Sequence, residues 1–360
     1  MLVSLPTVVA ALPASASKVT AATLLARIQQ SQRVGYSGYA ESLGGLSLPV
    51  TNQFSALSNL FGDRTQLRVW WRSARDWRVD SIGFSGETDL HGGDLGFWRW
   101  DYESNQATFT EQPTAPEIRL PTDLDLLPPQ LADRLLSQAT PAEASRLPAA
   151  RVAGISAPGI RIRPDEPAST VDHVDVWADA ATGLPLRVKV VGKQAGTTAL
   201  TASFLDVHLA TPPASSTAFA VPQGANLHSS ADPDLATAIN QLGGGTPPTR
   251  LAGIARNGQL PGLGSVGVYG QGVTEFVAAP LPRRIAFSLR RQLAPAAAAA
   301  DAANNKPTSA SPSDIVLNAG PLNLLLTSFN DPGGPWLLVG TVTADTLAKA
   351  ATDLRAAGSR

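Results

Sequence analysis

The stretch that decides the fold is residues 64–109, RTQLRVWWRSARDWRVDSIGFSGETDLHGGDLGFWRWDYESNQATF. Side chains alternate along it: Leu67, Val69 and Trp71 share one side of a strand, as Trp98, Trp100 and Tyr102 share one side of a later strand. Period-two alternation is typical of strands with one buried face. Short turns rich in Gly, Ser and Asn separate the strands. The stretch predicts an antiparallel meander with a concave side lined by large rings, which another part of the chain must cover.

The segments around this meander predict further strands and a few short helices. A helix capped by Thr20 carries Leu24, Leu25 and Ile28 on one stripe. Residues 43–62 form a long loop with apolar side chains, which we interpret as a flap. Helices over 130–138 and 141–146 are small insertions that can lie across the sheet as a lid. Strands resume at 153–163, 174–190 and 200–209, and the second of these ranges is a hairpin.

Bulk composition excludes several classes of protein. The chain has 360 residues, 43% of them hydrophobic and 16% charged, which is typical of a globular protein with room for two domains. Its net charge of −1 argues against nucleic-acid binding driven by counterion release. The absence of cysteine removes disulfides, thiolate metal sites and thiol catalysis.

The first residues have the character of an export signal. Residues 1–16 are uncharged and apolar, and they end in Ala14-Ser15-Ala16, which has the form of a signal-peptidase site. A basic segment that would precede the apolar run is missing, so we expect the start of this signal to be truncated here. The prediction is an extracytoplasmic protein, in the periplasm or cell envelope and peripheral to the membrane; the alternative is a floppy apolar tail.

Motifs for catalysis, metals or cofactors are missing. Gly262, Gly264 and Gly267 spell G-x-G-x-x-G, but a strand is expected to follow them, so the dinucleotide-binding context fails. No nucleophile elbow is present. The four histidines, His91, His173, His208 and His228, have no metal-binding spacing around them. We interpret His91 as a turn residue and His173 as a half-exposed strand residue. We therefore predict no enzyme activity, no cofactor and no metal.

The order of elements resembles the LolA/RseB superfamily of extracytoplasmic lipid-binding and lipoprotein-binding proteins. The best-matching pieces are 174–191, VDVWADAATGLPLRVKVV, and 204–225, which ends in FAVPQGA. The C-terminal part is similar to the small second domain of RseB/MucB, with a Y-x-x-G turn at 269–272, a V-x-G-x-V-like strand at 339–342 and an Ala-rich helix at 346–356.

The resemblance implies an α+β fold, a curved unclosed antiparallel β-sheet (half-barrel) with a helical lid, followed by a smaller α+β domain. Together with the composition, the predicted organisation is a signal-like segment (1–17), a lipid-binding domain (18–228), a linker (229–249) and a small domain (250–360) with a disordered insertion (294–312). It also implies a cavity for acyl chains, with Arg72 as a candidate lid latch. The candidate cavity residues, which core packing would explain equally well, are Trp71, Trp77, Val79, Trp98, Trp100, Tyr102, Leu124, Leu127, Leu131, Leu135, Val176, Leu186 and Val188.

Two classes of function follow. The first is a non-enzymatic envelope sensor that binds acyl lipid or lipoprotein and regulates a membrane anti-sigma factor through its extracytoplasmic domain, with a LolA-type lipoprotein carrier as its variant. The second is a protein–protein interaction module with a filled interior. A basic patch at Arg283, Arg284, Arg290 and Arg291 could meet anionic lipid or an acidic partner, or be a solvated face.

Overall fold

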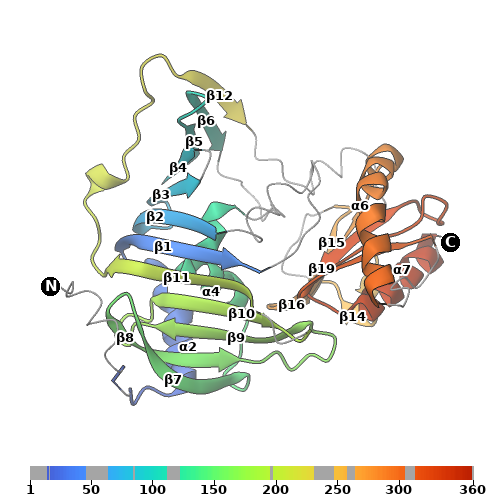
Figure 1. Cartoon of the computed structure of the whole chain (residues 1–360), viewed down its shortest axis with the longest axis horizontal. Coiled ribbons are helices and arrows are strands. Elements are labelled where there is room, and N and C mark those ends of the chain that lie inside the picture. The colour runs from blue at the N-terminus through green and yellow to red at the C-terminus, as the bar shows by residue number, and fades with distance from the viewer. Residues whose placement is uncertain are drawn as a thin grey trace.

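The computed structural model describes residues 14–15, 17–45, 64–83, 86–111, 122–194, 198–230, 247–257, 264–304 and 313–358. These residues form a twelve-stranded sheet, a five-stranded sheet and a two-stranded pairing. Figure 1 shows the larger sheet built from the N-terminal part of the chain and the smaller one from the C-terminal part. Most of the signal-like segment, the flap and the linker lies outside the described residues. Within the described ranges, no helix combines the length and the apolar character needed to cross a membrane.

The large sheet is open. Its strands are β1 (Tyr36–Gly44), β2 (Arg64–Ser73), β3 (Asp76–Gly83), β4 (Gly86–Gly93), β5 (Gly96–Asp101), β6 (Gln106–Glu111), β7 (Ala144–Val152), β8 (Ile155–Ile162), β9 (Val171–Ala178), β10 (Pro185–Gly192), β11 (Thr198–His208) and β12 (Asn226–Ser230). Their order in space is β12-β6-β5-β4-β3-β2-β1-β11-β10-β9-β8-β7. Neighbours are antiparallel apart from β12, which runs parallel to β6. Because β12 and β7 are the outer strands, the predicted unclosed sheet is confirmed.

Short helices cover one face of this sheet, which we call the inner face. Helix α2 (Ala21–Gln30) begins as predicted, because the Thr20 hydroxyl accepts a hydrogen bond from the Thr23 amide, and it buries Leu24, Leu25 and Ile28. Helix α4 (Pro128–Leu136) follows the short 3-10 turn η2 (Asp123–Leu126). The prolines at its first positions fit a helix start, where no amide donor is needed.

The C-terminal unit is a five-stranded sheet between two helices. Its strands are β15 (Gly267–Gln271), β16 (Thr274–Pro280), β17 (Ile315–Ala319), β18 (Leu322–Leu326) and β19 (Trp336–Gly340), in the order β15-β16-β19-β18-β17. Helix α7 (Ala344–Gly358) packs on the face that carries Val316 and Leu338, and α6 (Arg283–Asn304) packs on the opposite face, which carries Leu317 and Leu326. The small pairing of β13 (Arg250–Leu251) with β14 (Ile254–Ala255) precedes them. The predicted smaller α+β unit is confirmed.

Two local predictions are wrong. Residues 144–152 form β7, not the second lid helix, because pairing with β8 outweighs the local helix preference. The predicted disordered insertion at 294–312 is helical through Asn304, where α6 ends. A run of alanines, the best helix former, continues a helix already anchored on the sheet. Residues 305–312 lie outside the described part of the chain.

Backbone hydrogen bonds join the two sheets. The loop before β9 meets the end of β19: Ser169 forms a bridge with Val342, and the Thr170 amide donates to the Thr341 carbonyl at 3.0 Å. The Thr343 amide returns a bond to the Ala168 carbonyl at 2.9 Å. The C-terminal unit therefore continues the hydrogen-bonding pattern of the first sheet's loop and is held against it directly.

Candidate functional site

The inner face of the large sheet is packed with side chains. Trp71 and Trp77 stack with ring centroids 6.0 Å apart, and Tyr36 stacks on Trp71. Neither tryptophan is more than 7% exposed. One continuous cluster joins the sheet to the covering helices, and it includes these predicted cavity residues: Trp71, Trp77, Val79, Leu127, Leu131, Val176, Leu186 and Val188. Leu124 and Leu135 pack against its rim. Among the described residues, the space between sheet and helices is thus occupied by the chain's own core.

The remaining predicted rings lie on the opposite face, which we call the outer face. The register pairs Trp77 with Gly92 and Gly92 with Phe97, so Phe97 shares the inner face with Trp77. Trp98 is paired with His91 and therefore points to the outer side. Trp100 and Tyr102 share its side. Trp100 is buried, whereas Tyr102 is half exposed. Ten of the thirteen predicted residues thus lie on the inner side, in the sheet or the covering helical segment, and three lie on the outer side.

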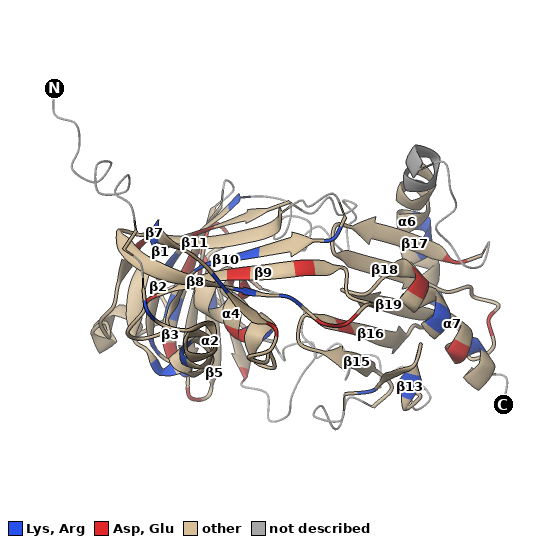
Figure 2. Ribbon diagram, turned by 90° about the horizontal axis from the view of Figure 1, so that it is seen from below, with Lys and Arg blue, Asp and Glu red and all other residues tan. Residues whose placement is uncertain are grey.

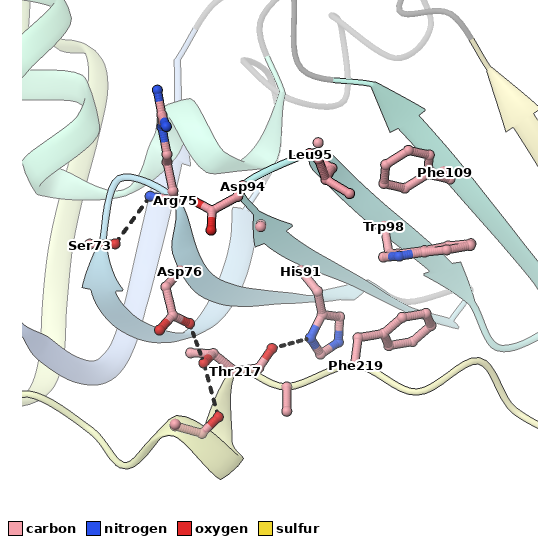
Figure 3. A pocket seen from close by; sticks show the side chains of 15 residues that line it. Ser73, Arg75, Asp76, His91, Asp94, Leu95, Trp98, Phe109, Thr217 and Phe219 are labelled. Atoms are coloured by element: carbon pink, nitrogen blue, oxygen red, sulfur yellow. Dashed lines mark hydrogen bonds between the residues drawn. The ribbon is translucent and has the colours of Figure 1, made fainter.

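A pocket of about 620 Å³ lies on the outer face. Its aromatic wall is formed by Trp98 of β5, Phe109 of β6 and Phe219, which comes from the segment between β11 and β12 (Figure 3). The centroids of Trp98 and Phe109 are 5.0 Å apart, and those of Trp98 and Phe219 are 5.5 Å apart. His91 lies against Phe219 at 4.7 Å. Three adjoining aromatic side chains and a flat imidazole thus form a largely apolar wall.

The segment 209–225, which we call the strap, crosses the strand ends and lines the pocket with Ala214, Thr217, Ala218 and Phe219. Hydrogen bonds hold it to the sheet: the Thr217 hydroxyl donates to Asp76, and the Thr217 carbonyl lies 3.1 Å from Nδ1 of His91 (Figure 3). Arg72 bonds Asp76 at 2.6 Å and donates to the Pro212 carbonyl. Arg72 therefore holds the strap against the outer face. Its role as a lid latch stays a prediction.

His91 is a buried group of this pocket, unlike the turn residue that the sequence suggested. Burial is the main cause that lowers the pKa of His91, against the opposing effect of its bond to Thr217. The neutral ring donates from Nδ1 to the carbonyl, and its Nε2 is then an acceptor. His173, expected to be half exposed, is buried on β9 beside Asp172 and Asp175. No local pattern predicts the pocket role of His91, because its partner Thr217 is 126 positions away.

A second polar feature of the outer face is a cluster of carboxylates and guanidiniums. Asp80 and Asp89 are paired across β3 and β4, and both are buried. Arg78 bonds both of them, at 2.6 and 2.8 Å. The oxygens of Asp80, Glu87 and Asp89 lie within 4.8 Å of one another, a spacing that fits a metal ion. Since Arg78 already bonds two of the carboxylates, we interpret the group as an ion-pair cluster.

Comparison with known proteins finds matches among solved structures. No family model matches it, and no curated protein matches it. Among solved structures, it is similar to MucB of Pseudomonas aeruginosa in complex with MucA, with 15% identity over 92% of this chain and 96% of that chain, and a TM-score of 0.44. A conserved protein of Thermus thermophilus matches at 11% identity over 57% of this chain and 97% of that chain, with a TM-score of 0.35.

A LolA superfamily protein of Nitrosomonas europaea matches at 11% identity over 56% of this chain and 98% of that chain, with a TM-score of 0.24. The MucB match spans both units of the chain, whereas the LolA match spans about half of it.

Proposed function

We propose that this chain is a non-enzymatic, extracytoplasmic binding protein that takes up the apolar chain of a lipid or lipoprotein in the outer-face pocket. One observation carries the proposal: a pocket of about 620 Å³ with an aromatic wall of Trp98, Phe109 and Phe219. Its volume lies within the range of roughly 300–1,000 Å³ that is usual for small-molecule sites. Of the residues predicted from sequence, the proposal keeps Trp98 as a ligand contact.

The physical basis is burial of hydrocarbon against rings. Each methylene group removed from water contributes about 0.8 kcal/mol, so a segment of several methylene groups gives useful affinity without a charged anchor. The polar rim of Asp76, Asp94 and Arg75 leaves one end of the pocket suited to a hydrophilic head. The filled inner face supports the choice of the outer face as the ligand site.

The test is to purify the full chain, extract it with organic solvent and identify released lipids by mass spectrometry. The delipidated protein is then titrated with a fluorescent fatty acid. We expect Trp98→Ala and Phe219→Ala to weaken binding at least tenfold. Leu205→Ala, which removes an exposed apolar side chain on β11, is the matched control. If no lipid is extracted and both pocket variants bind the probe as the parent does, the proposal fails.

A second candidate function is regulation of a membrane anti-sigma factor through binding of its extracytoplasmic domain. The resemblance to RseB suggests it, and the filled inner face favours an interaction module over a pure carrier. The bonded junction between the two sheets supports it further, because a fixed junction presents both units as one surface. Titration calorimetry of the full chain with the extracytoplasmic domain of a membrane anti-sigma factor tests the proposal. Absence of heat and of co-elution would count against it.

A further inference from the structure

The first three turns of α6 present arginines together with exposed apolar side chains. Phe287 is 56% exposed and Ile285 is 37% exposed. We call the group the α6 surface, and its basic residues are coloured blue in Figure 2. It consists of Arg283, Arg284, Ile285, Phe287, Arg290 and Arg291.

The spacing of these residues gives α6 two distinct sides. Ala286, Leu289 and Leu293 are buried against β17 and β18. Arg284, Phe287 and Arg291 are spaced i, i+3 and i+7, so they share one stripe, and all three are exposed. That stripe lies on the side of the helix opposite the buried one. The outward side therefore alternates cation, ring and cation along its length.

The part of α6 that carries these arginines has no carboxylate of its own. The first turn of α6 has no acidic residue, and residues 279–300 contain neither Asp nor Glu. Arg283 and Arg284 lie at the helix N-terminus, where the helix dipole is positive and basic side chains are unfavourable. Asp314 and Asp331, on neighbouring loops of the unit, are bonded by Arg355 of α7, and of the α6 arginines Arg290 also acts on Asp314. An external anion would thus remove an unfavourable arrangement.

We propose that the α6 surface docks on a bilayer that contains anionic phospholipid. A helix that lies in a membrane interface combines arginines, which meet the phosphates, with Phe and Ile side chains that enter the acyl boundary. Cation and apolar group are interleaved here on one stripe, which fits a lipid surface better than an acidic peptide that would meet only the charges. Phe287 is further placed by its contact with Phe329, at 6.1 Å between ring centroids.

This inference is independent of the outer-face pocket, because the α6 surface lies on the C-terminal unit and shares no residue with that pocket. It adds a way for the chain to approach the membrane from which a lipid or lipoprotein would come. Either proposal can fail while the other stands.

The experiment is co-sedimentation of the full chain with vesicles of pure phosphatidylcholine and with vesicles that also contain phosphatidylglycerol. We expect binding to the second kind only, and weaker binding as salt is raised. Arg284→Ala with Arg291→Ala should weaken binding by about 25-fold, since each arginine near an anionic surface contributes roughly fivefold. Phe287→Ser should weaken it by at least threefold while the salt dependence is kept.

The matched control is Arg33→Ala with Arg163→Ala, which removes two exposed arginines of the N-terminal unit. It should bind vesicles as the parent does, and unchanged thermal unfolding of the α6 variants shows that they are folded. Equal binding to both kinds of vesicle, no binding to either, or an equal loss in the control would overturn the proposal. Binding to polyglutamate but not to vesicles would assign the surface to an acidic partner and also overturn it.

Discussion

The replacement of Asp89 by Asn gives the sharpest test of the outer face. Asp89 is 2% exposed and faces Asp80 across the β3–β4 pairing. Burial is the main cause that raises the pKa of Asp89 to about 7, and the negative charge of Asp80 adds to it. The nearby Arg78 and the hydrogen bond from Tyr102 oppose the rise without cancelling it. A neutral Asp89 is therefore part of the folded state in mildly acidic solution.

The sign of the pH dependence follows from proton counting. In the unfolded chain an aspartate titrates near pH 3.9, so between about pH 4 and pH 7 only the folded state holds this proton. The free energy of unfolding therefore falls as the pH rises through this window. The pKa difference is roughly three units, which limits the loss to about 4 kcal/mol at 1.36 kcal/mol per unit.

Urea unfolding at intervals between pH 4 and pH 8 measures this effect. We expect Asp89→Asn to remove most of the slope that the group gives the parent protein, because the amide does not titrate. Asp101→Asn is the control on the same sheet. Burial acts to raise the pKa of Asp101, but hydrogen bonds from Arg99 and Thr88 outweigh it, so its pKa is lowered and its stabilisation is lost only in acid. Equal slopes in the parent and in Asp89→Asn would refute the reasoning.

Two further replacements test the packing. Gly92→Ala should destabilise the first unit by about 1–3 kcal/mol in urea unfolding, because a Cβ there would lie 2.2 Å from the Trp77 ring. The control Gly93→Ala should change the stability by less than about 0.5 kcal/mol, because the nearest contact of a Cβ there is 3.7 Å away. Equal effects at both glycines would contradict this packing. Arg355→Ala should lower the stability of the C-terminal unit by about 3 kcal/mol in calorimetry, because it leaves the buried Asp314 carboxylate without that partner. An unchanged melting temperature would argue against a structural role for the pair.

Alternation along the strands predicted which side chains share a side, but it did not predict how successive strands align. Leu67, Val69 and Trp71 are all buried on the inner face, as their spacing required. Trp98 and Trp100 share a side with each other but not with Trp71. The two-residue connection after Gly93 fixes the register, and a slip of one residue would have moved both rings to the other face.

The candidate site was less predictable because its parts come from distant segments. Phe219 and Thr217 follow the Pro-rich sequence after β11, where no period marks a contact partner. Their positions depend on hydrogen bonds to β3 and β4 that span more than 120 residues. Local sequence contains propensity and periodicity, and neither encodes such a crossing. The strand β12, which pairs in parallel with β6, was missed for the same reason.

The distribution of apolar side chains over the large sheet explains why the strap packs on the outer face. From β2 to β4 the inner face is apolar, and the covering helices bury it. In β5 and β6 the inner face carries Arg99 and Thr108, while Trp98 and Phe109 point outward. Two large rings on an outer face would meet water unless another segment covered them, and Phe219 of the strap packs against Trp98. Within the described ranges, the pocket is therefore the part of this second apolar surface that stays open, which is the physical reason to look there for a ligand.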